Sequence, residues 1–555
     1  MATALESASL VMIPSGYEEG TLGSLQPLDG TGDFTFSRGS NLSATRVNQD
    51  GYIEKGYENL LLQSNQFDTT WTTSNASLTG GQAGYDGSND AWVLEKTNSG
   101  GSISQSVSAN NLTTFSVYAK AATNSWLRFN IVGKANVFIN LSNGDIGQIQ
   151  GTAGITATAI NAGGGWYRCS FTYNTAITFQ VSIIVADSDG STSSPTGSIY
   201  IQDAQLNQGL AAYPYLETTT TSAKGGILEN TPRIDYTGGG AGSLLLEPSR
   251  TNDIPQSEYI KAIGAVQNMT LLNNASVNPQ GSQYATEAVP TANTATHLFF
   301  KGGMGNTANT FTQSIYAKAN GYNFCFIRID SPTNYAWFDL ENGVVGQTQS
   351  GMTSTIEDAG NGWYRCTATL TTSNYANAVI GVSNQDGVTA FTANGTSSVL
   401  FWGWQSELGT YPTSYIPTYG TSQTRAEDTA TNTDMINADN DFTLYFESNS
   451  LPADVGRYLS ISGNLGYLSA YSGGRIRWRY NNSNLSSPID EGVFKWLIRK
   501  DSTNIKMYVN GVVRYTIAAL PSALQSFNLQ EGCVYKTLLF PTALTDSACI
   551  ELTTI

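Results

Sequence analysis

Apolar and polar side chains alternate along most of the chain. In the stretch Trp166–Phe171, Tyr167 and Phe171 fall on one face of an extended strand and Arg168 falls on the other. The stretch Trp126–Ile131 alternates in the same way, and helical spacing is not sustained anywhere in the sequence. Turn-forming residues interrupt the pattern roughly every 8 to 12 residues, as β-sandwiches require. The pattern therefore predicts an all-β protein of antiparallel sheets, each with one buried and one outer face.

A large block of this pattern occurs twice. The sequence Gly165–Cys169 returns as Gly362–Cys366, and the upstream stretch Phe115–Ala121 has a counterpart in Gln313–Ala319. The spacing between matched stretches stays nearly constant, so few residues have been inserted or lost. A repeat of this length is too long for a solenoid. We therefore expect two sandwiches of one fold, at residues 58–222 and 251–430, joined by a connector at residues 223–250.

The two ends of the chain have a different character. Residues 1–57 are rich in turn-forming residues and poor in apolar ones, with only short strand-like pieces such as Phe34–Phe36. A segment this short cannot bury enough apolar surface to fold alone. We therefore expect residues 1–57 to form an arm that packs on another subunit or another protein. Residues 431–555 alternate again, and Ile505–Val513 predicts a hairpin with the two-residue turn Asn510–Gly511. This last segment is expected to form a separate β unit.

Composition limits the partners. Only 13% of the residues are charged and the net charge is −16 at pH 7, which argues against a nucleic-acid partner because phosphate binding needs clustered Lys and Arg. No stretch approaches the roughly 18 apolar residues of a membrane span. The N-terminus lacks the basic start of a secretory signal, so we expect synthesis in a cytoplasm. The five cysteines have no CxxC spacing and indicate neither a disulfide framework nor a zinc site, and Cys325 is expected in a core.

The sequence offers little for catalysis. His297 is the only histidine, beside an apolar run, so a packing role is expected and a multi-histidine metal site is excluded. Glycoside hydrolysis needs only two carboxylates about 5 to 10 Å apart, but the first repeat does not keep Glu247 and Glu407 as acids. The oxygen-rich loop Asp187–Gly190 is more typical of a plain turn than of a calcium site. We therefore expect no catalytic residues, no metal and no cofactor.

The aromatic and polar residues of the chain are more typical of a sugar-binding site than of a catalytic site. Apolar faces of sugar rings stack on aromatic side chains, while polar side chains bond the hydroxyl groups. Trp166 with Arg168, and Trp363 with Arg365, project from the outer faces of the two repeats. Packing of each Trp and Arg on one another is the more ordinary explanation, because a repeated tryptophan is more often framework. Carbohydrate binding by these residues is the alternative.

Two further surfaces are candidates for glycan contact. Trp402 and Trp404 stand two residues apart and are expected to share an aromatic face that the first repeat lacks. Arg475, Arg477 and Arg479 share one face of an alternating strand. In an acidic chain such a face would suit an acidic polysaccharide or an acidic subunit surface, with an ordinary solvated strand as the alternative. We include Arg477 among the candidate carbohydrate-binding residues.

Several stretches resemble proteins of bacteriophage virions. Phe36–Ser40 followed by Ala44–Val47 is similar to the opening of many such proteins. Leu244–Asn252 and Tyr411–Thr418 are similar to phrases in phage tail and fibre proteins, where they bracket jelly-roll domains resembling carbohydrate-binding modules. The Asn-Gly hairpin and the closing stretch Phe540–Asp546 resemble a laminin-G or concanavalin-like sandwich. The resemblance covers nearly the whole chain.

The resemblance implies both a fold and a function. The fold would be tandem antiparallel jelly-roll β-sandwiches followed by a laminin-G-like sandwich at residues 431–555. The function would be that of a non-enzymatic virion structural protein, a tail or head appendage that binds host-surface glycans, made in the host cytoplasm and exposed on the particle surface. A virion-associated polysaccharide-degrading enzyme and a purely architectural capsid or tail protein are the alternatives. Residues 1–57 would attach the chain to other virion proteins, and their apolar side chains favour a homo-oligomer, most simply a trimer.

Overall fold

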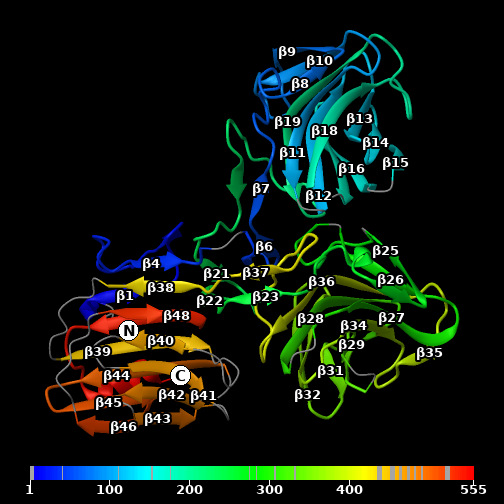
Figure 1. The fold of residues 1–555 in the computed structure, drawn as a ribbon. Helices are drawn as coiled ribbons and strands as arrows, with labels where there is room; N and C mark the ends of the chain where they lie inside the picture. The colour runs from blue at the N-terminus through cyan, green and yellow to red at the C-terminus, as the bar shows by residue number, and fades with distance from the viewer. Residues whose placement is uncertain are drawn as a thin grey trace.

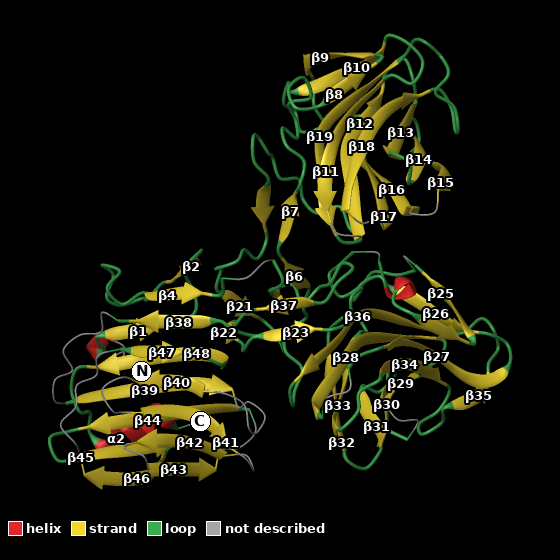
Figure 2. Cartoon of the chain, viewed as in Figure 1, coloured by secondary structure: helices red, strands yellow, loops and turns green. Residues whose placement is uncertain are grey.

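The structure is a computed structural model of the 555-residue chain, and its strands are grouped into three β units (Figure 1; Figure 2). Strands make up nearly all of the regular structure of the described residues, and helices are short segments such as α2 (Asp546–Thr553). No helix within these residues has the length and apolarity needed to span a membrane. The all-β fold expected from the alternation is confirmed. The residues that the structure describes are 6–39, 42–109, 112–151, 154–174, 177–273, 275–282, 284–305, 308–330, 333–433, 441–449, 457–461, 466–471, 475–480, 483–488, 492–518 and 526–554.

Residues 72–208 form the first jelly-roll sandwich, in which antiparallel sheets enclose an apolar core (Figure 1). Phe115 and Phe171 from one sheet meet Phe129 from the facing sheet, as their alternation predicts. The first sheet has the strand order β16 (Gly154–Gly163), β17 (Trp166–Asn174), β12 (Leu112–Ala121), β19 (Ser198–Gln208), β10 (Ala91–Lys96) and β9 (Ala76–Gln82). The facing sheet has the order β15 (Ile146–Gly151), β14 (Ala135–Asn140), β13 (Trp126–Ile131), β18 (Ile177–Ala186), β11 (Ser102–Ala109) and β8 (Thr72–Ser74).

Residues 265–408 form a second jelly roll with the same strand order, which confirms the duplication at the level of topology. Its core includes Cys325 and Cys366, whose Sγ atoms lie 4.0 Å apart, so Cys325 is a core residue as expected. One sheet has the order β25 (Met269–Leu272), β26 (Thr286–Pro290), β36 (Ser398–Leu408), β28 (Asn309–Asn320), β33 (Tyr364–Thr372) and β32 (Met352–Asp358). The facing sheet has the order β24 (Ala265–Gln267), β27 (Thr294–Gly302), β34 (Asn377–Ser383), β29 (Phe324–Ile329), β30 (Tyr335–Asp339) and β31 (Val344–Thr348), with β35 (Ala390–Thr392) also paired to β27.

The C-terminal unit is a third sandwich, and α2 packs on its outside behind the N-cap residue Thr545. The predicted hairpin is confirmed: Asn510 and Gly511 both have positive φ, as its two-residue turn requires. One sheet has the order β21 (Arg233–Asp235), β22 (Ser243–Leu246), β48 (Gly532–Phe540), β39 (Phe442–Asn449), β44 (Val493–Lys500), β45 (Asn504–Val509) and β46 (Val512–Ala518), with β1 (Leu10–Met12) also paired to β48. The other has the order β2 (Tyr17–Glu18), β3 (Thr21–Leu22), β4 (Phe34–Ser37), β38 (Thr429–Asn432), β47 (Phe527–Leu529), β40 (Arg457–Ile461), β41 (Gly466–Tyr471), β42 (Arg475–Tyr480) and β43 (Ser483–Pro488).

The N-terminal segment belongs to this C-terminal unit and does not form a separate arm. Strand β1 pairs with β48, and β4 pairs with β38. The side chains of Leu10, Met12, Phe34 and Phe36 are all buried in the same core as Trp496. The expectation that the segment lacks a core of its own holds, but the partner that buries its apolar residues is the other end of the same chain. The connector contributes too, because β21 and β22 extend the sheet beyond β48.

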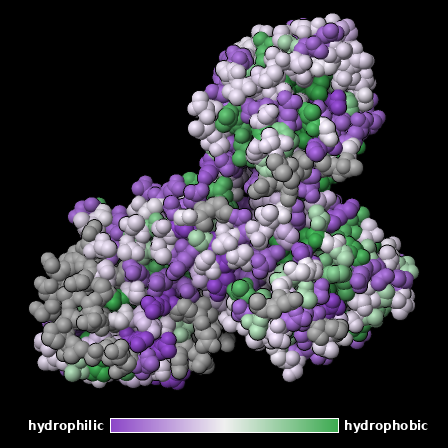
Figure 3. Space-filling model, viewed as in Figure 1, coloured by the Kyte–Doolittle hydropathy of each residue, from purple (hydrophilic) through white to green (hydrophobic). Residues whose placement is uncertain are grey.

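Short ladders tie the three units together at a central junction (Figure 1). They pair β5 (Thr45–Val47) with β6 (Ile53–Lys55), β7 (Tyr57–Asn59) with β20 (Ala223–Gly225), and β23 (Arg250–Asn252) with β37 (Gln423–Arg425). Hydrophilic residues dominate the surface over this junction on the face shown in Figure 3. The chain therefore crosses the junction several times on its way between units.

Candidate functional site

The first Trp–Arg pair is packed into the surface of its own sandwich. The side chain of Trp166 is 3% exposed, and the rings of Tyr85 and Tyr200 lie 6.5 and 6.3 Å from it, centre to centre. Arg168 does not stack on Trp166. Its guanidinium lies 5.5 Å from the ring centre of Tyr118 and donates a hydrogen bond to a backbone carbonyl, that of Tyr213. The pair thus holds the loop after β19 against the sheet.

The second pair repeats this arrangement. Trp363 is 2% exposed, and its indole Nε1 donates to the Val277 carbonyl at 3.1 Å. The guanidinium of Arg365 lies 5.6 Å from the ring centre of Tyr316, and its Nη2 donates to the Thr413 carbonyl at 2.6 Å. Both tryptophans are covered in this structure, so neither offers a ring face to a ligand.

Trp402 and Trp404 do not share the expected face. Both are fully buried, but Trp404 lies in the sandwich core while Trp402 packs outside it, against Tyr415. A β-bulge separates them: Gly403 has a φ of 65°, and the pairing of β28 with β36 slips by one residue there. The glycine between two apolar strand residues was the sequence signal for this bulge.

The alternation around Arg477 is confirmed. In β42, Ile476 and Trp478 are fully buried, whereas Arg475 and Arg477 are half-buried on the outer face and Arg479 is exposed. Arg477 is therefore more exposed to solvent than the tryptophans that the sequence offered as candidates for sugar binding, all of which are buried.

Three stretches named in the sequence analysis meet in one buried ion network at the junction: Phe36–Ser40, Leu244–Asn252 and Tyr411–Thr418. Arg38 of the first stretch pairs with Asp428 at 3.0 Å between Nη1 and Oδ1. Glu247 of the second stretch pairs with Arg233 at 2.8 Å and with Arg425 at 3.0 Å. The side chains of all five are almost completely buried. The third stretch joins through Ser414, whose backbone N–H and hydroxyl each donate to Glu247 at 2.6 Å.

Electrostatics keeps this network charged. Burial alone would raise the pKa of Glu247, but the charges of Arg425 and Arg233 outweigh it and hold the pKa at about 2. Burial lowers the pKa of Arg38 to about 10, against the attraction of Asp428. A buried charge that loses its partner is strongly destabilising. The three stretches therefore tie the N-terminal segment, the connector and the segment after the second jelly roll to one another, and the local sequence pattern does not predict this role.

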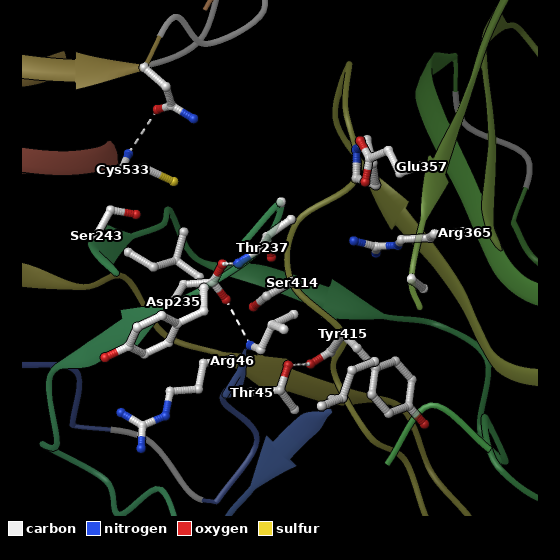
Figure 4. Close-up of a pocket in the computed structure, with 18 of the residues that line it drawn as sticks. Thr45, Arg46, Asp235, Thr237, Ser243, Glu357, Arg365, Ser414, Tyr415 and Cys533 are labelled. Carbon is white, nitrogen blue, oxygen red and sulfur yellow. Dashed lines mark hydrogen bonds between the residues drawn. The ribbon is translucent and has the colours of Figure 1, made fainter. Parts of the chain in front are cut away.

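A cleft of about 1030 Å³ opens beside this network, between the second jelly roll and the C-terminal unit (Figure 4). One wall is the outer face of β32 and β33, and another is the loop of residues 410–415. The connector and the β5–β6 hairpin form the floor, and residues of the C-terminal unit close the far side. The cleft therefore exists only because the three regions are held in one arrangement.

Hydrogen-bonding groups and aromatic rings converge on this cleft. Arg365 extends into it from β33 (Figure 4), and neither its Nε nor the buried hydroxyl of Thr367 has a hydrogen-bond partner among the described residues. Glu357, opposite Arg365 in the sheet, is exposed at the rim. Tyr236 and Tyr411 are half-buried in the lining. The exposed polar side chains of β32 beside these ring faces suit a ligand that carries both hydroxyl groups and apolar faces.

Two carboxylic acids have strongly raised pKa values. Burial raises the pKa of Asp203 to about 7, and the nearby Asp90 and Asp86 add to the effect. Burial also raises the pKa of Glu531 to about 7. Asp203 belongs to the first jelly roll and Glu531 to the C-terminal unit, so the two acids do not face each other across one site.

Other sequence candidates have structural roles. His297 is fully buried, with Nδ1 2.6 Å from the Asn268 carbonyl oxygen and Nε2 3.2 Å from that of Phe391, as a packing role predicts. Asp187 accepts from Lys96 at 2.6 Å, and Asp189 accepts from the Gln148 backbone N–H at 2.8 Å. Asp187 and Asp189 thus fix turns.

No protein-family model matches the sequence, and no curated protein matches it either. Among solved structures, the chain is similar to the CBM40 of the Ruminococcus gnavus IT-sialidase, with 13% identity, 21% of this chain and 85% of that chain covered, and a TM-score of 0.18. It is similar to the N-terminal CBM22-1–CBM22-2 tandem domain of Paenibacillus barcinonensis Xyn10C, with 11% identity, 67% and 100% covered, and a TM-score of 0.23. It is also similar to domains LG4-5 of the mouse laminin alpha1 chain, with 13% identity, 46% and 89% covered, and a TM-score of 0.17. These three neighbours are carbohydrate-binding modules and laminin G domains.

Proposed function

We propose that the protein is a non-enzymatic structural component of a bacteriophage virion, an appendage on the particle surface that binds host-surface glycans in the central cleft. The observation that carries the glycan part is the cleft itself, where the exposed side chains of Thr355 and Glu357 line a wall beside half-buried tyrosines. The virion part rests on the resemblance of the three stretches that meet in the ion network.

The geometry favours binding over hydrolysis. Glu247, the most deeply buried acid of the cleft, is already engaged by two arginines and by Ser414, and its pKa of about 2 leaves it no proton to donate at neutral pH. Asp235 accepts from the backbone N–H groups of Val47 and Thr237 at 2.8 and 2.9 Å. Glu247 and Asp235 therefore hold the structure together.

The glycan part is tested by titrating the full-length protein against a glycan array and against surface polysaccharides of candidate host bacteria. We expect Thr355→Ala combined with Glu357→Ala, both at the exposed rim, to weaken binding at least about tenfold, because each removes a group that can bond sugar hydroxyls. The matched control is Glu341→Ala, an exposed acid of the same unit outside the cleft lining.

Three outcomes would contradict the proposal in different ways. Absence of binding to any glycan removes the glycan part and favours a purely architectural protein. Binding that the rim variants leave unchanged moves the site out of the cleft. Steady shortening of the polysaccharide at catalytic amounts of protein makes the chain an enzyme. The virion part is tested separately by labelling purified particles with a specific antibody in electron micrographs, where absence of label overturns it.

A further inference from the structure

The outer face of the C-terminal unit carries a cluster of positive charge that does not line the cleft. It consists of Arg457 on β40, Tyr467 on β41, and Arg475, Arg477 and Arg479 on β42, and we name it the arginine face. In a chain with a net charge of −16, such a concentration of one sign is unusual. Like charges held close together repel one another, and an anion bound between them relieves that repulsion.

Strand register sets the spacing of these side chains. Arg457, Ser469 and Arg477 stand in one row across three strands, and Tyr467 pairs with Arg479 in the neighbouring row. Residues opposite each other lie about 5 Å apart, and residues two apart along a strand lie about 7 Å apart. Arg457 and Arg477 therefore stand on either side of Ser469 in one row, and Arg479 stands beside Tyr467 in the next row.

The core beneath the arginine face fixes its orientation. Ile476 and Trp478 of β42 are fully buried and Tyr480 is 4% exposed, so the strand cannot turn its arginines inward. A slip of one residue would bury three charges and expose three large apolar side chains. The sheet thus presents the arginines permanently to the outside.

Arg457 and Arg479 both lie over the Tyr467 ring, with guanidinium carbons 4.2 and 5.9 Å from the ring centre. Neither arginine forms an ion pair with a carboxylate of the described residues. The hydrogen bond from Arg479 and the charges of Arg477 and Arg457 lower the pKa of the Tyr467 hydroxyl. The positive charge of Arg457 and Arg479 is therefore available for an anion.

We propose that the arginine face binds an acidic polysaccharide. Carboxylate or sulfate groups of the polymer pair with the guanidinium groups of Arg457 and Arg479. The site gives the protein a second ligand class, and it does not rest on glycan binding in the cleft.

A polysaccharide fits this face better than a nucleic acid. Proteins that bind nucleic acids carry basic surfaces over much of a domain, whereas this chain is acidic outside the arginine face. Single-stranded nucleic acids also need several exposed ring faces for base stacking. The Tyr467 ring of the arginine face is already in contact with two guanidinium groups.

The experiment measures binding of the full-length protein to immobilised heparin, alginate, neutral dextran and single-stranded DNA. We expect binding to heparin or alginate but not to dextran, with a loss of at least about tenfold between low and high salt. Arg457→Ala combined with Arg479→Ala should abolish it. The charge-matched control removes two exposed cations elsewhere, Arg514→Ala with Lys134→Ala, and should bind as the unmodified protein does.

Equal binding by the double arginine variant and the unmodified protein would overturn the proposal, provided that both show the same thermal midpoint. Preference for DNA over both acidic polysaccharides would overturn it in favour of a nucleic-acid site. The rim variant Glu357→Ala separates this site from the cleft, because it should leave binding to acidic polysaccharide intact. Loss of that binding in Glu357→Ala alone would place the polymer in the cleft and contradict the role of the arginine face.

Discussion

At the scale of single residues, the structure assigns the strongest electrostatic constraint to Glu247. Its carboxylate contacts Arg233 and Arg425 in a junction closed to solvent. Exposed ion pairs contribute little to stability, whereas a buried pair that loses one partner leaves an uncompensated charge. The junction and the surface pair Lys224–Glu229, with side chains 40% and 39% exposed, therefore make a matched comparison within one chain.

We expect Glu247→Gln to destabilise the junction by about 3 kcal/mol at neutral pH, measured by chemical denaturation. Its folded pKa of about 2 lies below the unfolded value of about 4.3, so the stabilisation is present above about pH 4 and is lost as the pH falls towards 2. The difference between variant and unmodified protein should shrink over that range. Glu229→Gln should change stability by less than about 0.5 kcal/mol. Equal effects of the two substitutions would contradict the role given to the network.

Asp203 gives the opposite pH dependence. Its folded pKa of about 7 lies above the unfolded value of about 3.9, so the folded first jelly roll loses stability as the pH rises from about 4 to 7. Asn at this position accepts the hydrogen bond from the Tyr85 hydroxyl and tolerates the positive φ of 56°. We expect Asp203→Asn to raise the thermal midpoint of this unit at pH 8 and to leave it unchanged at pH 4. A gain of equal size at both pH values would show that ionisation is not the cause.

At the scale of elements, the N-terminal strands behave as part of the C-terminal sandwich. The side chains of Leu10 and Met12 from β1, and of Phe34 and Phe36 from β4, are buried in its core. Removing several such side chains costs far more than a small unit can lose, since one buried Leu or Met truncated to Ala already costs about 2 to 5 kcal/mol.

Deletion of residues 1–39 should therefore unfold the C-terminal unit and leave both jelly rolls folded. Limited proteolysis followed by mass spectrometry measures this, with rapid cleavage expected after about residue 430 and protection between residues 72 and 408. The milder variant Met12→Ala should lower the thermal midpoint of the same unit. A truncated protein with an intact C-terminal unit would restore the interpretation of the segment as an independent arm.

At the scale of the whole molecule, self-association and attachment through residues 1–57 stay predictions. Many apolar side chains of this segment, such as those of Leu10, Met12 and Phe34, are buried within the chain, but the loop after β3 keeps Leu25 and Leu28 48% and 92% exposed. These two exposed leucines offer apolar surface that a second copy of the chain could cover.

We expect light scattering of the full-length protein to give a mass near three times 59.3 kDa, and Leu25→Asp with Leu28→Asp to reduce it to that of one chain. Ile160→Asp, at an apolar position that is 66% exposed in the first jelly roll, is the control and should leave the mass unchanged. A monomer mass for the unmodified protein would contradict self-association, and a multimer that keeps its mass in the leucine variant would move the contact elsewhere.

The sequence alone determined everything that depends on local pattern. Alternation predicted the strands and their buried faces, the duplication predicted two units of equal topology, and Asn510–Gly511 predicted its hairpin. These features are set by neighbours along the chain, because a period of two and a positive-φ turn are properties of adjacent residues. The alternation of outer arginines and buried apolar residues in β42 was predicted correctly for the same reason.

Only the tertiary structure decided which distant segments share a core and a site. The pairing of β1 with β48 joins the two ends of the chain, and nothing in the local pattern of Leu10–Met12 names that partner. The bulge at Gly403 sends Trp402 and Trp404 to opposite faces, because one extra residue reverses the alternation beyond it. The cleft likewise depends on a junction where buried charges from Arg38 to Asp428 meet. Such contacts are set by packing between segments far apart in the chain, and a sequence read in order does not contain them.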